Sequence, residues 1–241
     1  MPRILIITQE KGGVGKTIFA RALAEAIVDA PIIEVDASRR MLELGDRVQY
    51  FKMRADRKDI EKTGGSASRA EFDGVINAIE EAKTSTIVDI GANTSETFLA
   101  VLSEVAPLLA REGFEFGVCV VVTNEPGALA ATPTLLSLAR PWANALFLIE
   151  NLLHGDALPS LTQQMLEGVK LSSFQNHKTK MEKEADKYLQ AGGLAMIAKL
   201  DPAKLRQEHK LNLTNRIMLD LTAFRLDAMQ AVRPAAEWLI G

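Results

Sequence analysis

A glycine-rich segment near the amino terminus carries the residues best suited to chemistry. Residues 11 to 17 read Lys-Gly-Gly-Val-Gly-Lys-Thr, between the apolar run Ile4 to Ile7 and a helical pattern that opens at Thr17. Glycines let successive backbone N–H groups approach phosphate oxygens, while lysine and threonine can meet the terminal phosphates and Mg²⁺. The segment predicts a phosphate-binding loop for a nucleoside triphosphate. The expected nucleotide contacts are Gly12, Gly13, Val14, Gly15, Lys16, Thr17 and Ile18, with Thr17 also a metal ligand.

Two later apolar runs end in carboxylates that can serve the same site. Asp36 follows Glu34 by two residues, so both side chains point to the same side of a strand. Asp89 closes the run from Thr86 and precedes Gly91, where the chain can turn close to a γ-phosphate. A carboxylate in this place accepts from metal-bound water. We therefore expect Asp89 at the metal, and one of Glu34 and Asp36 facing the phosphates.

The loop resembles the deviant Walker A loop of the ParA/MinD family of ATPases. In that family the first lysine reaches the nucleotide of the partner subunit in a sandwich dimer. The resemblance implies catalytic roles for Lys11, acting across the dimer, and for Lys16, the ordinary phosphate-binding lysine. It also implies ATP and Mg²⁺ as cofactors, slow ATP hydrolysis and a homodimer with ATP between its subunits. The sequence departs from the family at Ile18, where most members have a second Thr or Ser.

The resemblance extends to two strand ends. Asp36 matches the second acid of the family's Asp-x-Asp element, which orients the hydrolytic water and helps to hold the metal shell, whereas Glu34 replaces the first. Asn151 resembles the strand-end Asn that reads the adenine ring, although Leu152 replaces the Arg that commonly follows. The chain lacks a guanine-binding Asn/Thr-Lys-x-Asp signature, which favours ATP.

Apolar runs and helical patterns alternate over the first 150 residues. The runs are Ile4 to Ile7, Pro31 to Val35, Thr86 to Ile90, Phe116 to Val122 and Ala145 to Ile149. This alternation predicts an α/β fold with a doubly wound, mainly parallel sheet of the P-loop NTPase type. We expect a single ATPase domain over 1–241, with a nucleotide-binding core at 1–151 and a helical extension without strands at 152–241. Residues 37–69 break the rhythm and predict an irregular excursion, and Pro234 is expected to end or kink the last helix.

Composition narrows the class of protein. The 241 residues are 47% hydrophobic and 24% charged, with a net charge of −3, as in ordinary soluble proteins. Residues 151–241 carry 12 Lys and Arg against 10 Asp and Glu, which is far from a strongly basic nucleic-acid-binding domain. The lone Cys119 excludes a disulfide framework within one chain. Without a long apolar run or a leader segment, we expect a cytoplasmic protein that does not insert into membranes.

Partners and alternatives remain open. A basic cluster between residues 39 and 58 can contact a phosphate backbone or a partner protein, or simply be solvated; it comprises Arg39, Arg40, Arg47, Lys52, Arg54, Arg57 and Lys58. Besides the homodimer, we expect DNA or a stimulating protein as partner, in plasmid partitioning or conjugative transfer. One alternative is a small-molecule ligase or kinase on the same loop architecture. Another is a nucleotide-binding scaffold with little turnover.

Overall fold

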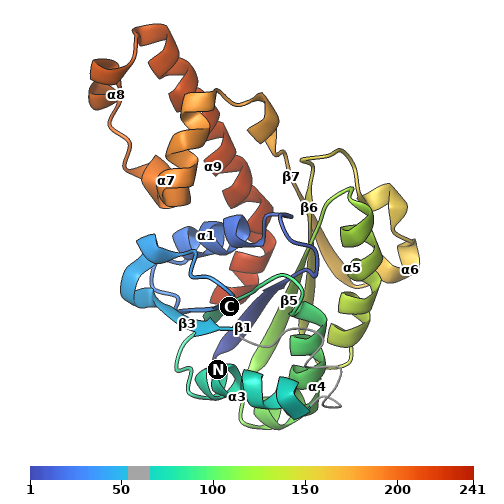
Figure 1. Ribbon diagram of the computed structural model, residues 1–241. Helices are drawn as coiled ribbons and strands as arrows, with labels where there is room; N and C mark the ends of the chain where they lie inside the picture. Colours follow the sequence, from blue (N-terminus) through green and yellow to red (C-terminus); the bar gives the residue numbers. More distant parts are fainter. Residues whose placement is uncertain (54–65) are drawn as a thin grey trace.

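The computed structural model describes residues 1–53 and 66–241. This part of the chain forms a seven-stranded sheet in the order β3-β2-β4-β1-β5-β6-β7, with every neighbouring pair parallel (Figure 1). The strands are β1 (Arg3–Thr8), β2 (Ile32–Asp36), β3 (Val48–Lys52), β4 (Thr86–Ile90), β5 (Glu115–Val122), β6 (Ala145–Asn151) and β7 (Val169–Phe174).

Helices cover both faces of the sheet. Helices α1 (Lys16–Ala26) and α9 (Leu211–Ile240) lie on one face, with α7 (Lys183–Ala198) packed on them. Helices α3 (Ser66–Glu80), α4 (Ser95–Arg111) and α5 (Pro126–Ala139) cover the other. The shorter elements are α6 (Gln163–Leu166), α8 (Pro202–Glu208) and the 3₁₀ turns η1 (Leu42–Arg47), η2 (Leu158–Ser160) and η3 (His177–Lys180). The predicted doubly wound α/β fold is confirmed.

Strand β1 shows how the sequence builds a core on each face. Ile4 and Ile6 belong to the core beneath α3, α4 and α5, whereas Leu5 and Ile7 belong to the core beneath α1 and α9. All four side chains are fully buried. A parallel sheet covered on both faces needs apolar residues at consecutive strand positions, and the five predicted strands therefore read as unbroken apolar runs.

The sequence prediction was wrong about the two edge strands. β3 lies within the segment predicted to be irregular, and β7 lies within the extension predicted to lack strands. Each mixes buried or half-buried residues with exposed ones, as in Val-Gln-Tyr-Phe-Lys, because an edge strand is incompletely covered. Neither therefore forms an apolar run. Arg54, Arg57 and Lys58 of the basic cluster lie outside the described residues.

The carboxyl-terminal helices form an arm. Helices α7 and α8 and the first half of α9 project beyond the sheet, and the second half of α9 lies along it (Figure 1). Helix α9 continues through Pro234, so the expected end there is wrong; burial of Ala235, Ala236 and Leu239 outweighs the hydrogen bond that proline cannot donate. Within residues 1–53 and 66–241, no helix is both long enough and apolar enough to cross a membrane.

Candidate nucleotide site

The predicted phosphate loop connects the carboxyl end of β1 to the start of α1. Gly15 is the residue that caps α1 and has φ of 101°, and Gly13 has φ of 82°; both values favour glycine. A cleft of ≈ 170 Å³ opens here, lined by Gly12 to Ile18 together with Asp36, Arg40 and Ala92. The helix amino terminus favours an anion at this position.

Gln9 anchors the beginning of the loop. It directly precedes Glu10, which occupies the position of the first glycine in a Gly-x-x-x-x-Gly-Lys-Thr loop, and it is fully buried. Its Nε2 donates to the carbonyl of Val121 (2.9 Å) and of Ala128 (3.2 Å), while its Oε1 accepts from the Glu10 backbone N–H (2.9 Å). The amide therefore joins the loop to β5 and α5, a role that a glycine could not perform.

Lys16 is folded back over the loop. Its Nζ donates to the backbone oxygen of Gln9 at 2.8 Å, and only 8% of the residue is exposed. Burial lowers the pKa of this lysine, while the neighbouring carboxylates of Asp89 and Asp36 act in the opposite direction. A cation that burial has already stripped of water is well placed to meet phosphate oxygens.

Thr17, which lines the cleft, is bonded to the buried Asp89 in β4. The Thr17 hydroxyl donates to Oδ2 of Asp89 at 3.1 Å. Burial raises the pKa of Asp89 to about 7, with Lys16 and the Thr17 hydrogen bond opposing the rise. Its other oxygen, Oδ1, is buried and has no hydrogen-bond partner among the described residues.

These two oxygen-bearing side chains fit Mg²⁺. This ion takes oxygen ligands and commonly uses only one or two protein groups beside phosphates and water. Among the described residues, no cluster of three or more His, Cys, Asp or Glu is suited to a metal. The orphaned Oδ1 of Asp89 can accept a hydrogen bond from metal-bound water.

Asp36 lies at the same edge of the sheet and is held by Arg40. The Arg40 guanidinium contacts both carboxylate oxygens, with Nε 3.1 Å from Oδ2 and Nη2 3.4 Å from Oδ1. Glu34 is buried and directed elsewhere, because its Oε1 accepts from the Arg40 backbone N–H at 2.6 Å. Burial raises the Glu34 pKa, an effect that this hydrogen bond opposes. Glu34 thus holds the backbone of the loop after β2 at Arg40.

Asn151 lies against the phosphate loop. Its Nδ2 donates to the Val14 carbonyl at 2.8 Å, and its Oδ1 is buried without a partner in the described part of the chain. The structure therefore assigns Asn151 a contact with the loop backbone, while adenine recognition by this residue stays a prediction. The partly buried Ile18 packs against the core beneath α1.

Lys11 lies at the rim of the site and is directed away from the cleft. Its Nζ is 3.5 Å from Oε2 of Glu125, and 46% of its side chain is exposed. The same carboxylate lies 3.2 Å from Nε2 of His154 through its other oxygen. Lys11 is therefore close to its own nucleotide site without lining it, and it remains accessible from outside.

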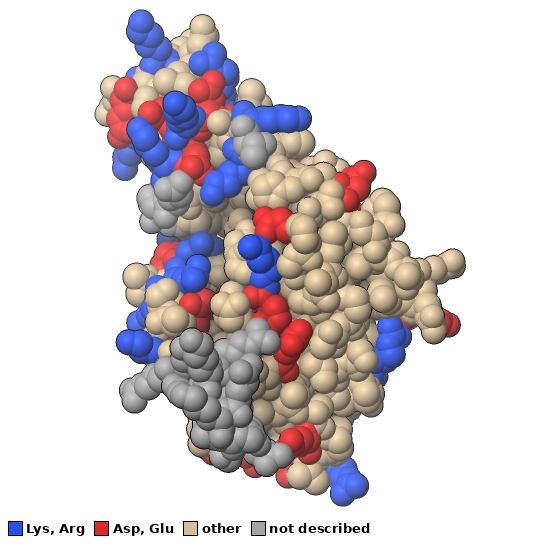
Figure 2. Space-filling view, turned by 45° about the vertical axis from the view of Figure 1, so that its right-hand side comes forward, with Lys and Arg blue, Asp and Glu red and all other residues tan. Residues whose placement is uncertain are grey.

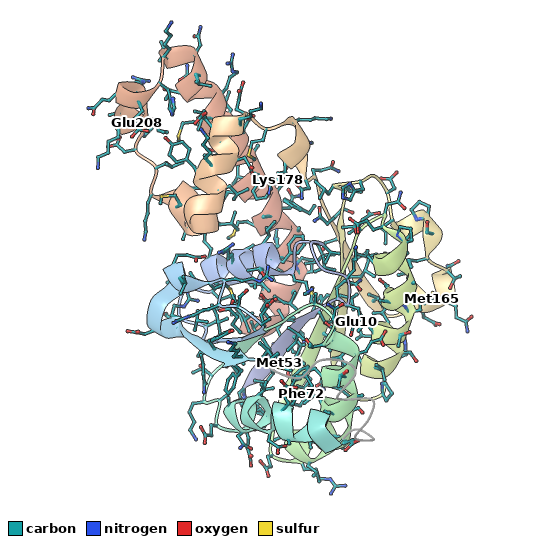
Figure 3. The ribbon with its side chains drawn as sticks, in the orientation of Figure 1. Glu10, Met53, Phe72, Met165, Lys178 and Glu208 are labelled. Carbon is teal, nitrogen blue, oxygen red and sulfur yellow. The ribbon has the colours of Figure 1, made fainter. Side chains whose placement is uncertain are left out.

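Glu10 links the loop to the opposite helical layer. Its carboxylate accepts from the Glu96 backbone N–H in the first turn of α4, and its carbonyl accepts from the Asn93 N–H at 3.0 Å. Figure 3 shows Glu10 in the middle of the molecule, far from Lys178 and Glu208 on the arm. The chain after Asp89 is thus bonded to the beginning of the phosphate loop.

Comparison with known proteins gives the fold. The chain matches no family model and no curated protein sequence. Its structure aligns over 92% of its length with 96% of a single-residue variant of Cyanothece McdA, solved as an ATP complex, with a TM-score of 0.50 and 12% identity. Apo McdA from Cyanothece gives a TM-score of 0.46 at 12% identity, covering 92% of this chain and 98% of that one. FtsY from Mycoplasma mycoides gives a TM-score of 0.40 at 12% identity, and the alignment covers 71% of this chain and 59% of FtsY.

The chain shares the doubly wound α/β fold of McdA. Within it, the structure gathers the predicted loop residues, Asp36 and Asp89 around one cleft, with Lys11 at its rim and Asn151 against the loop. The sequence analysis did not identify Gln9 as an anchor of the loop. It named Arg40 only as one member of the basic cluster and assigned it no role at the cleft. A polar residue directly after a buried strand was the available signal for Gln9, and the four-residue spacing from Asp36 was the signal for Arg40.

Proposed function

We propose that this protein is a ParA/MinD-like ATPase that binds Mg²⁺ and ATP between two copies of the chain and hydrolyses ATP slowly, so that nucleotide state controls dimerisation. The observation that carries the proposal is the Thr17–Asp89 hydrogen bond of 3.1 Å beside Lys16 and Asp36. A threonine at a helix start bonded to a strand-end acid is the metal-binding half of P-loop NTPase chemistry.

Each side chain has a defined task in this proposal. The loop N–H groups and Lys16 hold the phosphates, and the Thr17 hydroxyl together with Asp89 would hold the metal shell. Bound Mg²⁺ would supply positive charge against the phosphate oxygens. Asp36 accepts a hydrogen bond from the attacking water and orients it toward the terminal phosphate. Lys11 adds positive charge from the opposite subunit, where charge develops during transfer.

The surface beside Lys11 supports a dimer. Helix α5 begins next to Lys11, with Gly127 close to the lysine stem, and its 14 residues include no Asp, Glu, Lys or Arg. Figure 2 shows a broad area with few charged groups on this side of the molecule. Charged residues are depleted in the cores of protein interfaces, so a second copy can approach here at a small desolvation cost.

The test is sedimentation of the wild type and Lys11→Ala with ATP and Mg²⁺, each on an Asp36→Ala background that slows hydrolysis. We expect the Asp36→Ala protein to be a dimer with ATP and a monomer with ADP. Adding Lys11→Ala should abolish the dimer and leave ATP binding to the monomer intact. The matched control is Lys83→Ala, which removes an exposed lysine just before β4, at the amino ends of the strands and so opposite the cleft.

Two outcomes would overturn this function. If the sedimenting mass is the same with ATP and with ADP, a nucleotide-binding scaffold with little turnover would be favoured. If ATP is turned over only when a small-molecule acceptor is present, a ligase or kinase would be favoured.

The arm supports DNA as the partner, in partitioning or conjugative transfer. The arm, residues 183–225, carries eight Lys and Arg against five Asp and Glu. Figure 2 shows these basic side chains on the projecting arm, interspersed with acidic ones. Exposed lysines and arginines with a positive excess bind a phosphate backbone through release of its counterions.

A further inference from the structure

We propose that Arg40 senses the γ-phosphate from within its own subunit, by exchanging the Asp36 carboxylate for the terminal phosphate of ATP. The inference rests on the proposed nucleotide site and adds a residue that discriminates ATP from ADP. It follows from the contrast between the Arg40 backbone, which is fixed by two hydrogen bonds, and the Arg40 side chain, which is exposed and contacts Asp36.

The Arg40 backbone is fixed on both sides. Its N–H donates to the buried carboxylate of Glu34 at 2.6 Å, and its carbonyl accepts from Nη2 of Arg21 at 2.8 Å. Arg21 is itself held by Glu43, with Nε 2.5 Å from the carboxylate. Helix α1, strand β2 and turn η1 therefore jointly set the position from which the side chain extends.

The Arg40 side chain, in contrast, is exposed and held by a carboxylate that the proposed chemistry needs. Its exposed fraction is 55%, and the guanidinium contacts Asp36 at 3.1 and 3.4 Å. It lines the same cleft as Gly12 to Ile18. Its charge also reaches Lys16, whose pKa is lowered chiefly by burial and additionally by Arg40.

The chemistry of the cleft favours an exchange. A guanidinium binds carboxylate and phosphate with the same planar pair of N–H donors, so one ligand can replace the other. A γ-phosphate entering the cleft would meet the Asp36 carboxylate, which repels it. Moving Arg40 onto the phosphate offsets that repulsion and releases the Asp36 carboxylate to accept from water. ADP lacks the γ-phosphate, so it gains little from Arg40.

The experiment measures the dissociation constants of Mg²⁺-ATP and Mg²⁺-ADP by competition against a fluorescent nucleotide. Arg40→Ala should weaken ATP binding by about 10- to 100-fold, the range for a lost hydrogen bond to a charged group. ADP binding should change by less than about threefold. Arg40→Lys keeps the charge without the planar pair of donors and should retain part of the preference for ATP. Arg39→Ala, at the neighbouring exposed arginine, should change neither constant.

A second pair of variants separates phosphate contact from support of Asp36. On an Asp36→Ala background, Arg40→Ala should still weaken ATP binding, because the phosphate contact does not depend on the carboxylate. Loss of the effect on that background would show that Arg40 only positions Asp36, and equal losses for ATP and ADP would also overturn the inference. A wild type that binds neither nucleotide would instead refute the proposed function.

Discussion

At the scale of single residues, Gly15 is required for two separate reasons. Its φ of 101° is strained for any residue with a Cβ. A Cβ built there would also lie 2.9 Å from Nδ2 of Asn151, the atom that donates to the Val14 carbonyl. Gly13 shares the first reason but not the second, because its φ is 82° and a Cβ there would meet nothing within 4 Å. Comparing substitutions at the two glycines therefore separates the cost of backbone strain from the cost of steric crowding.

We expect Gly15→Ala to destabilise the protein more than Gly13→Ala. Backbone strain alone costs about 1–2 kcal/mol, and the forced displacement of Asn151 adds about 1–3 kcal/mol in the first variant. Urea unfolding followed by circular dichroism measures both. Adding Asn151→Ala to Gly15→Ala should recover part of the loss, since it removes the crowding but not the strain. Equal costs at the two glycines would contradict this account.

Asp89 makes stability depend on pH in the nucleotide-free protein. Its pKa is raised by burial from 3.8 to about 7, so the folded state holds a proton that the unfolded state has already released. The stability that this proton contributes is fully present below about pH 4 and is lost as the pH rises through about 7. Asp89→Asn removes the titrating group with almost no change in shape.

Between pH 5.5 and 7.0, the free energy of unfolding of the wild type should fall by about 1–2 kcal/mol more than that of Asp89→Asn. The measurement is urea unfolding of both proteins in EDTA without nucleotide. At pH 7.0 the asparagine variant should be the more stable protein. A wild-type advantage that grows with pH would have the opposite sign and would show that Asp89 is ionised and well paired in the fold.

At the scale of elements, Arg47 joins η1 to the carboxyl end of α1. Its Nη1 donates to the Ala24 carbonyl at 3.0 Å, and its Nη2 donates to the carbonyls of Ile27 (2.9 Å) and Ala30 (3.0 Å). These are carbonyls at and just beyond a helix end, where the helix itself provides no partner. Arg47 was predicted only as part of a basic cluster, and the structure gives it a structural task there.

Arg47→Ala should therefore destabilise the fold by about 2–3 kcal/mol, because it leaves several part-buried carbonyls without a charged donor. Thermal and urea unfolding would check this, with the exposed Arg39→Ala as the control. The two variants remove equal charge, so any difference between them measures the helix-end contacts. Indistinguishable stabilities would mean that water replaces Arg47 at no cost.

The same scale shows what the sequence could and could not predict. Buried central strands were predictable because both of their faces demand apolar residues, and strand-end acids such as Asp36 and Asp89 were placed by those strands. The edge strands β3 and β7 were not predictable, because helices cover them incompletely and polar residues are therefore tolerated at their exposed positions. Gln9 finds its partner carbonyl 112 residues away at Val121. Lys11 likewise meets Glu125, and no local pattern records either contact.

At the scale of the whole molecule, one long helix connects the two ends of the structure. The second half of α9 packs along the sheet, and its first half carries the arm with α7 and α8. At the sheet end, Nη1 of Arg3 donates to the Trp238 carbonyl at 2.5 Å. At the arm, Lys204 and Arg206 of α8 are exposed. The arm thus presents basic groups at a distance from the nucleotide cleft.

If the arm binds DNA, reversing two of its charges should weaken that binding without disturbing the nucleotide site. We expect Lys204→Glu with Arg206→Glu to lower affinity for a duplex about tenfold or more and to reduce the salt slope, log K against log [salt], by about 2, because two phosphate contacts are lost. Fluorescence anisotropy in ATP on the Asp36→Ala background gives both numbers. The control is Lys83→Glu with Arg111→Glu, which makes the same charge change at exposed residues that precede β4 and β5, at the amino ends of the strands. Duplex binding responds to net charge as well as to direct contacts. An equal loss of duplex affinity in the two double variants would therefore refute a site on the arm. Only a loss of affinity that is specific to the α8 variant supports it.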